Sequence, residues 1–387
     1  MTASDIITFV RIGKSLISII EPSLTNAYPH PEPSSAHMTD WTRSCPDPSE
    51  EHAEAARRRQ ASLTKPHGAL GRLENIAIEL AALQRTERPK ADRVEIIVFA
   101  GDHGVTSRSV SAYPSTVTVE MLRNFTAGGA AISVLARTLG ARLEVVDAGS
   151  FATAPILGVM TDKPRAGTRD FSRESALTQE EVAFAMAAGA RAIARSSERR
   201  PDLIVLGEMG IGNTTSAAAM ASAMLRLPPA EVVGPGTGLD ELGLARKIAA
   251  VAEALALHRL TQAEASPWAA LQFVGGLEIA ALTGAIIASA QRSIPILVDG
   301  FIVSVAALAA CRINASVRPW LLFAHRSAER GHAAVLAALQ AEPILDLGLR
   351  LGEGSGAAVA VPILRMACAL HNEMATFDEA SVSGRMV

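Results

Sequence analysis

An α/β fold with a doubly wound, mainly parallel sheet flanked by helices is predicted by an alternation that runs through most of the chain. Short apolar runs rich in β-branched residues alternate with long, alanine-rich stretches of helical character. The runs are apolar on both faces, which is typical of strands covered by helices on both sides, and the alternation favours parallel βαβ units. The predicted strands are residues 94–99, 143–146, 203–206, 271–274, 294–298 and 320–323.

The segments around these runs have the length and composition of helices. Before the first strand, residues 49–84 have a helical pattern, which Lys65-Pro66-His67-Gly68 interrupts because proline and glycine both break helices. The predicted helices after the first strand are residues 117–139, 179–198, 215–225, 240–257, 278–291, 303–310, 327–339 and 357–374.

The N-terminal part of the chain differs in composition. Residues 21–37 are rich in Pro, Ser and His, which is typical of a linker, and Met38 follows directly. We therefore expect residues 1–37 to be a disordered extension. An amphipathic helix that binds a partner is the alternative for this segment.

The composition argues against several classes of protein. The chain has 387 residues, of which 49% are hydrophobic, so it can bury a large core. A formal net charge of -3 and an aromatic content of 4% argue against a nucleic-acid binder. Cys45, Cys311 and Cys368 are widely spaced, so neither a disulfide framework nor a cysteine zinc site is expected, and a cytoplasmic location fits. No apolar stretch reaches the roughly 18 residues of a membrane span.

Polar or glycine-rich turns follow all six predicted strands. Ligands bind at the carboxyl ends of strands in open parallel sheets, so the sequence predicts a ligand site there. Asp and Gly also occur in ordinary turns, which explains one such turn better than it explains six. In chain order the turns are Gly101-Asp102-His103-Gly104, Asp147, Gly207-Glu208-Met209-Gly210-Ile211-Gly212-Asn213, Gly275-Gly276, Asp299-Gly300 and His325.

Two carboxylates in these and later turns are candidates for chemistry. Glu353 lies between glycines in the segment 352–356, where no bulky neighbour keeps it from a substrate proton, as a general base requires. A solvated loop acid is the alternative. Glu208 precedes Asn213, which can cap the next helix, so a capped turn with an incidental Glu208 is also possible. His325 is interpreted as an orienting or hydrogen-bonded core histidine, and Asp102-His103 lacks a third ligand for a metal.

A glycine-rich turn, Gly234-Pro235-Gly236-Thr237-Gly238, precedes a predicted helix that starts near Asp240. Glycines let backbone amides approach an anion, and the start of a helix adds partial positive charge. Lys247, about two helical turns later, could add a full charge. A phosphate site and a plain loop remain equally compatible with this turn alone.

The residues alone support an α/β enzyme with a phosphate-bearing ligand and a carboxylate base. A nucleotide-dependent dehydrogenase would need Gly-x-Gly-x-x-Gly after a strand, and that motif is absent. A binding module without catalysis is the second alternative, and turnover distinguishes it from an enzyme.

Several longer motifs occur together in one order. With them the chain resembles the nicotinate-nucleotide–dimethylbenzimidazole phosphoribosyltransferase family from about Leu63 to Phe377. The motifs are Lys65-Pro66-His67-Gly68-Ala69-Leu70-Gly71-Arg72-Leu73-Glu74, Asp102-His103-Gly104-Val105, Val110-Ser111-Ala112-Tyr113-Pro114, Gly207 to Thr215, Val298-Asp299-Gly300-Phe301, His325-Arg326-Ser327-Ala328-Glu329 and Leu351 to Ala357.

The resemblance implies a fold, an assembly and a reaction. It implies a Rossmann-like α/β catalytic domain at residues 91–345 with a six-stranded sheet. A small helical domain would combine residues 38–90 with residues 346–387, which carry the Glu353 loop. It implies a homodimer without metal. We also expect a cytoplasmic enzyme that needs no cofactor and has no nucleic-acid or membrane partner. The implied reaction moves the phosphoribosyl group of nicotinate mononucleotide to 5,6-dimethylbenzimidazole.

The resemblance also implies residue roles. Glu353 matches the family's general base, and Glu208 matches an acidic residue near the ribose and the reacting centre. The remaining substrate-binding positions fall into a phosphate segment, an acidic floor position and a benzimidazole pocket. They are Gly210, Ile211, Asn213, Gly234, Gly236, Thr237, Gly238 and Lys247 for the nucleotide, Asp299 for the floor, and Tyr113, Met121 and Leu351 for the pocket. Tyr113 and Met121 occupy pocket positions whose residues vary in the family, so the preferred base stays open.

Overall fold

The computed structural model describes residues 8–12, 15–19 and 40–383. The chain divides into two compact units, Met1–Asp40 and Trp41–Val387. In the first unit, the strands β1 (Thr8–Ile12) and β2 (Ser15–Ile19) pair in antiparallel fashion. The rest of the segment for which we expected a disordered extension lies outside the described residues.

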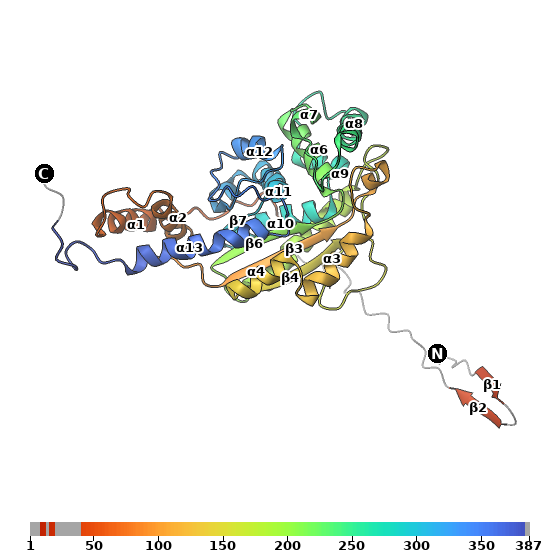
Figure 1. The fold of residues 1–387 in the computed structure, drawn as a ribbon, viewed down its shortest axis with the longest axis horizontal. Helices are drawn as coiled ribbons and strands as arrows, with labels where there is room; N and C mark the ends of the chain where they lie inside the picture. Colours follow the sequence, from red (N-terminus) through yellow and green to blue (C-terminus); the bar gives the residue numbers. More distant parts are fainter. Residues whose placement is uncertain (1–7, 13–14, 20–39, 384–387) are drawn as a thin grey trace. The chain divides into compact units, whose positions relative to one another are not determined.

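The second unit is built on a six-stranded, all-parallel sheet, which confirms the predicted fold class (Figure 1). The strand order is β5-β4-β3-β6-β7-β8. Non-consecutive neighbours such as β3 and β6 require crossover connections, which helices supply. The strands are β3 (Val94–Gly101), β4 (Arg142–Gly149), β5 (Met160–Thr161), β6 (Leu203–Met209), β7 (Ile296–Val298) and β8 (Leu321–Phe323).

One predicted strand is wrong. Residues 271–274 form the end of helix α9 (Pro267–Val274), whose first turn is capped by Ser266 accepting from the Ala269 amide at 3.2 Å. A four-residue apolar run fits a buried helix as well as a strand, and Ser266-Pro267 is a helix start signal. The sixth strand is instead β5, an exposed two-residue edge strand with no apolar run to predict it.

Two of the helices predicted after the first strand differ from the structure by more than a few residues at their ends. The segment 117–139 is two helices, α3 (Thr116–Ala127) and α4 (Ala131–Leu139), because Gly128 ends α3 with φ +85°. The segment 327–339 is helical only in α12 (His332–Ala338). The other helical segments are η1 (Gly104–Arg108), α5 (Gln179–Ser197), α6 (Asn213–Leu225), α7 (Pro229–Val232), α8 (Glu241–Leu257), α10 (Leu277–Gln291), α11 (Phe301–Ile313), η2 (Ala315–Trp320) and α13 (Ser355–Glu373).

Helix α10 lies at the centre of the core and is buried along its whole length. It contacts strands β3, β4 and β6 and packs closely on α5. A Cβ at Gly189 of α5 would overlap the Ala281 carbonyl, and a Cβ at Gly284 of α10 would overlap the Met186 carbonyl. The two glycines therefore let the two helix backbones come into contact. This packing fixes the position of α10, whose first residues lie against the ends of strands β3 and β4.

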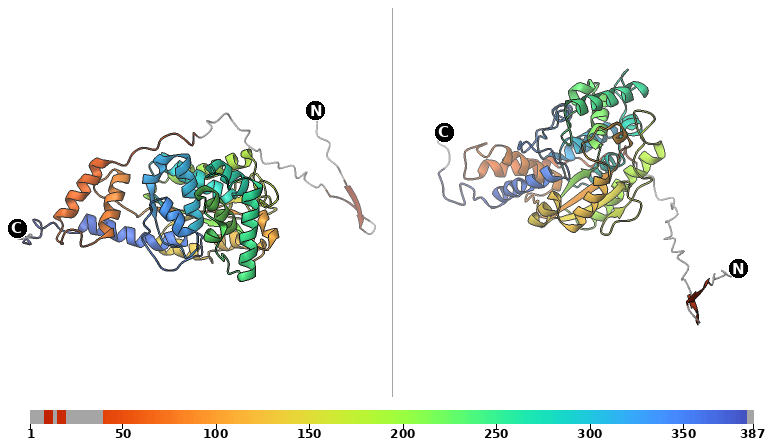
Figure 2. Two further views of the ribbon diagram at one scale, coloured as in Figure 1. Left: turned by 90° about the horizontal axis from the view of Figure 1, so that it is seen from above. Right: turned by 45° about the vertical axis from the view of Figure 1, so that its right-hand side comes forward.

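Segments from both ends of the second unit meet in a group of helices (Figures 1 and 2). Helix α2 (Arg72–Gln84) packs against α13 and against α1 (Glu50–Ser62). The Arg59 side chain donates to the His371 carbonyl at 2.6 Å, and Leu63 bridges to Thr376. The division into a helical and a catalytic domain at residues 38–90, 91–345 and 346–387 stays a prediction.

Over residues 8–12, 15–19 and 40–383, the structure contains no helix that is both long enough and apolar enough to cross a membrane.

Candidate active site

A cavity of about 340 Å³ lies where strands β6, β7 and β8 end. Residues at or after these ends line it, namely Glu208, Asp299 and His325. Most of the predicted site residues meet here, although Gly234, Gly238 and Lys247 do not line the cavity. The predicted residues that line it are Tyr113, Met121, Glu208, Gly210, Ile211, Asn213, Gly236, Thr237, Asp299, Leu351 and Glu353.

Glu353 is presented on a turn with an uncommon backbone. Gly352, Glu353 and Gly354 have φ values of +86°, +63° and +81°, and α13 starts directly afterwards. Such values suit glycine, whereas a non-glycine residue there is strained. The Glu353 amide donates to the Glu208 carbonyl at 3.1 Å. The strained residue is thus tied to the end of β6.

The Glu353 carboxylate is buried and meets the start of a helix. Its Oε2 accepts from the Ile132 amide, in the first turn of α4, at 3.2 Å. Burial raises the pKa of Glu353, and the nearby Asp299 acts in the same direction, while the Ile132 hydrogen bond opposes them. A carboxylate with a raised pKa is a stronger base once ionised, which suits proton abstraction near neutral pH.

Glu208 lines the same cavity as Glu353 and is also buried. Asn213 donates from its amide group to Glu208 Oε2. A Cβ at Gly352 would overlap Glu208 Oε1, so the glycine makes room for this carboxylate. Burial raises the pKa of Glu208 well above its usual range, and the charges of Asp299, Glu278 and Glu353 add to this.

Asp299 joins the end of β7 to the start of α13. Its Oδ1 accepts from the Ala357 amide at 2.8 Å, and His325 Nε2 lies 3.6 Å from the same oxygen. Both side chains are buried. His325 therefore lies beside Asp299 in the cavity wall, in a place that an orienting residue would occupy.

Lys247 stabilises the glycine-rich turn at residues 234–238 through hydrogen bonds. The ammonium group donates to Thr214 Oγ1 at 2.8 Å and to the Gly234 carbonyl at 3.1 Å, and only 1% of the residue is exposed. Burial lowers the pKa of Lys247 to about 8, with Glu329 opposing the shift. Lys247 thus supports the turn, while Gly236 and Thr237 face the cavity.

Several lining residues were missed at the level of sequence. Arg350 donates to the Gly236 carbonyl at 2.9 Å and so connects the turn at 234–238 with the Glu353 loop. The positive charge of Arg350, three residues before Glu353, is a feature of the sequence from which its place in the site could have been predicted. Val117 lies four residues before Met121 on α3, and this i, i+4 spacing could have placed it on the same face of the helix. The other missed residues are Met209, Thr214, Gly300, Phe301, Ile302, Val303, Ser327, Glu329 and Gly352.

A search of the described part of the chain finds no group of three or more His, Cys, Asp or Glu side chains that could hold a metal ion. The cavity combines four buried carboxylates, those of Glu208, Asp299, Glu329 and Glu353, with apolar side chains and a glycine-rich turn. Such a site can bind a phosphate-bearing ligand beside a flat apolar one and remove a proton between them.

Comparisons with known proteins agree with this chemistry. A family model described as Phosphoribosyltransferase matches residues 45–382. A nicotinate-nucleotide–dimethylbenzimidazole phosphoribosyltransferase from Bradyrhizobium sp. (strain ORS 278) is 63% identical over 350 residues, which are 90% of this chain and 99% of that protein. The enzyme of the same name from Pseudomonas aeruginosa (strain PAO1) is 56% identical over 346 residues, 89% of this chain and 98% of its own.

A solved structure is also similar. The crystal structure of the phosphoribosyltransferase of the same name from Thermus thermophilus aligns with a TM-score of 0.82 and 42% sequence identity. The alignment covers 87% of this chain and 100% of that one. On these grounds the chain belongs to the nicotinate-nucleotide–dimethylbenzimidazole phosphoribosyltransferase family.

Proposed function

We propose that this chain transfers the phosphoribosyl group of nicotinate mononucleotide to 5,6-dimethylbenzimidazole, giving α-ribazole 5′-phosphate and nicotinate. The observation that carries the proposal is the Glu353 carboxylate, which is held on a glycine turn and lines one cavity together with Glu208. The turn at 234–238 borders the same cavity and supplies a place for the phosphate. A relative of 63% identity carries the name of this enzyme.

In the proposed reaction one C–N bond breaks and another forms. One ring nitrogen of the benzimidazole attacks the anomeric carbon, while Glu353 takes the proton from the other nitrogen. The bond from the ribose to the pyridinium nitrogen breaks, and its electron pair stays with nicotinate. The leaving nitrogen departs neutral and needs no acid. The configuration at the anomeric carbon inverts.

The buried carboxylates also stabilise the positive charge that develops on the sugar in the transition state. A ribose that loses its leaving group before full attack has oxocarbenium character, and preorganised negative charge stabilises it. Asp299 is held by the Ala357 amide and is available for this role. Holding two ligands in line contributes up to about 7–11 kcal/mol of the barrier, so positioning and electrostatics together supply the catalysis.

The direct test is to incubate the purified protein with nicotinate mononucleotide and a panel of benzimidazoles, purines and phenols, and to identify products by mass. Release of nicotinate with formation of a ribazole phosphate is the expected result. Saturable binding without nicotinate release would instead show a binding module. Tight binding of a nicotinamide dinucleotide with hydride transfer would favour a dehydrogenase.

Lys247→Ala is expected to raise the KM for nicotinate mononucleotide while kcat changes little. Removing the ammonium group leaves Thr214 and the Gly234 carbonyl without their shared donor, so the turn that we assign to the phosphate loosens. Steady-state kinetics with varied nucleotide measure this. Lys90→Ala, at an exposed position, is the control. An unchanged KM in Lys247→Ala would show that Lys247 does not contribute to phosphate binding.

As pH is lowered, the wild-type enzyme should lose activity at a higher pH than it would if its base were a glutamate with the usual pKa. The base acts only when ionised, and burial raises the pKa of Glu353. As pH falls through this raised pKa, Glu353 gains a proton and the rate declines. A profile of kcat/KM for the acceptor against pH measures where the rate declines on the acid side. A decline centred at or below about pH 4.3, the usual pKa of glutamate, would contradict the role of Glu353 as the base.

We also propose that the enzyme works in the cytoplasm as a homodimer, without metal or cofactor. Tyr113 and Leu351, which line the cavity, are 56% and 59% exposed, so they offer apolar surface that a second copy could cover. Light scattering of the purified protein measures the assembly, and a monomer at working concentration would refute the dimer. Full activity after dialysis against a chelator is the expected result for a metal-free site.

A further inference from the structure

A buried threonine that the proposed reaction does not use joins two sides of the active site. Thr118 lies on α3, and none of its surface is exposed. The Ile211 amide donates to Thr118 Oγ1 at 3.1 Å, and the hydroxyl donates to Asp102 Oδ1 at 2.6 Å. A threonine inside a helix often bonds a carbonyl in the preceding turn of its own helix. Thr118 instead bonds one residue after β3 and one after β6, which needs an explanation.

Helix α3 carries part of the pocket that we assign to the benzimidazole. Val117 and Met121 line the cavity from this helix, and Tyr113 lines it from the segment just before the helix starts. Thr118 is adjacent to Val117 in the chain but is buried away from the cavity. Its hydroxyl therefore acts on the position of the helix and makes no contact with a substrate.

Ile211 belongs to the part of the cavity that we assign to the nucleotide. It lines the cavity, and α6 starts two residues later at Asn213. Asn213 donates to Glu208 Oε2, and Thr214 Oγ1 accepts from the Lys247 ammonium group at 2.8 Å. The position of the Ile211 backbone therefore affects both an acidic residue of the cavity and the support of the turn assigned to the phosphate.

Asp102 is a fixed partner for the hydroxyl. It is fully buried, and its Oδ2 accepts from the Phe151 amide at 2.8 Å. The Asp102 amide donates to the Gly149 carbonyl at 2.9 Å, at the end of β4. Because the Ile211 amide can only donate, the Thr118 proton is directed to Asp102. The three groups therefore form one chain of hydrogen bonds with a single direction.

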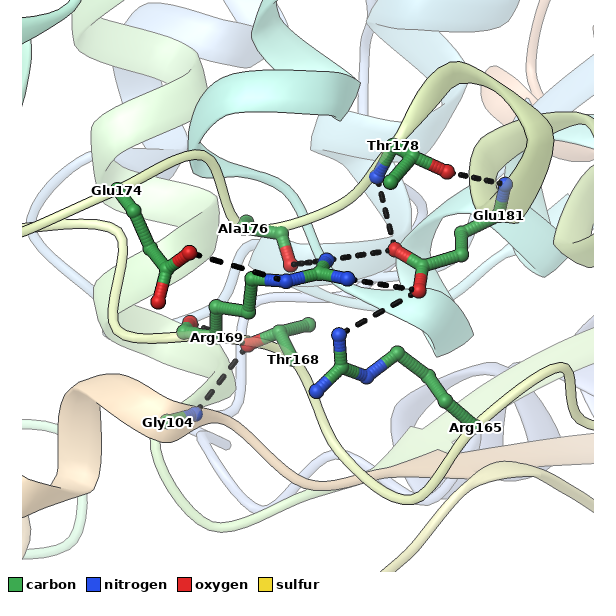
Figure 3. A network of polar contacts seen from close by, with 8 residues as sticks. All are labelled: Gly104, Arg165, Thr168, Arg169, Glu174, Ala176, Thr178 and Glu181. Atoms are coloured by element: carbon green, nitrogen blue, oxygen red, sulfur yellow. Dashed lines mark hydrogen bonds and ion pairs between the residues drawn. The ribbon is translucent and has the colours of Figure 1, made fainter.

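A loop holds the backbone at Asp102 in place (Figure 3). The Thr168 amide donates to the Asp102 carbonyl at 2.9 Å, and the Gly104 amide donates to Thr168 Oγ1 at 3.2 Å. Arg169 fixes this loop through two hydrogen bonds to Glu181 of α5, the shorter at 2.7 Å. These contacts hold Asp102 independently of its bond to the threonine.

The end of β3 is packed without spare room. A Cβ at Gly101 would lie 2.5 Å from Glu278 Oε2 on α10, and a Cβ at Gly276 would lie 2.7 Å from the same atom. A Cβ at Gly210 would overlap the Gly101 carbonyl. The turn after β6 therefore lies directly against the end of β3, so the two segments that the Thr118 hydroxyl joins are in contact.

We propose that Asp102 and Thr118 form a positioning pair, which holds the benzimidazole pocket on α3 at a fixed distance from the nucleotide-binding turn at Ile211. The inference rests on the proposed function. The attacking ring nitrogen and the anomeric carbon must lie in line, and they belong to ligands on the two sides of this contact. A misplacement of about 1 Å can cost about 10²-fold in rate, so a hydrogen bond between the two sides contributes to kcat without touching either ligand.

The first test is Thr118→Val, which keeps the shape of the side chain and removes the hydroxyl. We expect kcat to fall by about 10²-fold, while the KM for each substrate stays within a few-fold, because each side still binds its own ligand. Thr118→Ser keeps the hydroxyl and should restore kcat to within a factor of a few. Steady-state kinetics with each substrate varied measure these values. A folded Thr118→Val with the kcat of the wild type would overturn the proposal, and Thr118→Ala gives the same test if the valine variant does not fold.

Asp102→Asn tests whether the two residues act as one unit. The amide group of asparagine brings a donor to a place where the Thr118 hydroxyl and the Phe151 amide both need an acceptor, so kcat should fall here too. The variant with both Asp102→Asn and Thr118→Val should lose no more than the larger of the two single losses. Losses that multiply would overturn the pairing of Asp102 with Thr118.

Thr283→Val is the matched control. Thr283 is also fully buried in a helix, but its hydroxyl donates at 2.8 Å to the Ile279 carbonyl of its own helix, α10. This variant should lose thermal stability and keep the kcat of the wild type. The comparison separates positioning from a general loss of stability.

Hydrogen exchange provides a measurement that needs no turnover. The Ile211 amide should exchange faster in Thr118→Val, because its acceptor is gone, and mass spectrometry of a peptide that covers residues 207–213 measures this. Thr118→Ser and Thr283→Val should exchange there as the wild type does. Unchanged exchange in Thr118→Val would overturn the proposal, whereas failure of the wild type to release nicotinate would refute only the proposed function.

Discussion

Glu353→Gln is expected to lower kcat by about 10²–10⁴-fold, the usual contribution of a positioned general base. The glutamine oxygen still accepts from the Ile132 amide, as the carboxylate does at 3.2 Å, so the turn keeps its shape. What the variant loses is the capacity to take the benzimidazole proton. The KM for nicotinate mononucleotide should stay near that of the wild type, because the turn at 234–238 is untouched. Steady-state kinetics with both substrates measure the two effects.

Glu51→Gln provides the control for this change, since Glu51 is exposed on α1. It should behave as the wild type. If Glu353→Gln turned over within a factor of a few of the wild type, Glu353 would not be the base. Glu208, the other candidate, would then become the first residue to test.

The fold could be predicted because its strands carry a strong local signal. Strands β3 and β6 are buried and apolar, and the predicted runs at 94–99 and 203–206 lie within them. Strand β5 has two exposed residues and is defined only by its pairing with β4. The run at 271–274, which lies in α9, predicts a strand because four apolar residues do not reveal their period. Local pattern thus predicts the centre of the sheet better than its edge.

The site could be predicted as a set of residues but less well as a geometry. Strand order brings the ends of β6 and β7 together, so Glu208 and Asp299 meet as the topology rule requires. The position of Lys247 could not be predicted, because its spacing shows a charge near the turn but gives no orientation of the side chain. The same holds for Glu278. Its relation to Gly101 and Gly276 arises only when α10 packs under the sheet ends.

Gly207→Ala is expected to lower kcat by about 10²-fold or more through displacement of Glu353, although Gly207 makes no contact with substrate in the proposed mechanism. A Cβ at Gly207 would overlap the Glu353 carbonyl and lie 2.5 Å from the Gly354 amide nitrogen. These are backbone atoms and cannot rotate away. Strand β6 is fixed between β3 and β7, so the Glu353 turn has to move. A misplacement of about 1 Å can cost about 10²-fold in rate.

The stability change separates this effect from simple unfolding. Overpacking costs about 1–3 kcal/mol, which a shift in the thermal midpoint measures alongside kcat on the folded protein. Gly348→Ala is the matched control, because Gly348 precedes the same turn and a Cβ there meets nothing within 4 Å, while its φ of +68° costs an alanine about 1–2 kcal/mol. The control should therefore lose stability and keep its kcat, whereas Gly207→Ala should lose both. A folded Gly207→Ala with the kcat of the wild type would show that the Glu353 turn tolerates displacement, and the role we give to its close contact with β6 would be wrong.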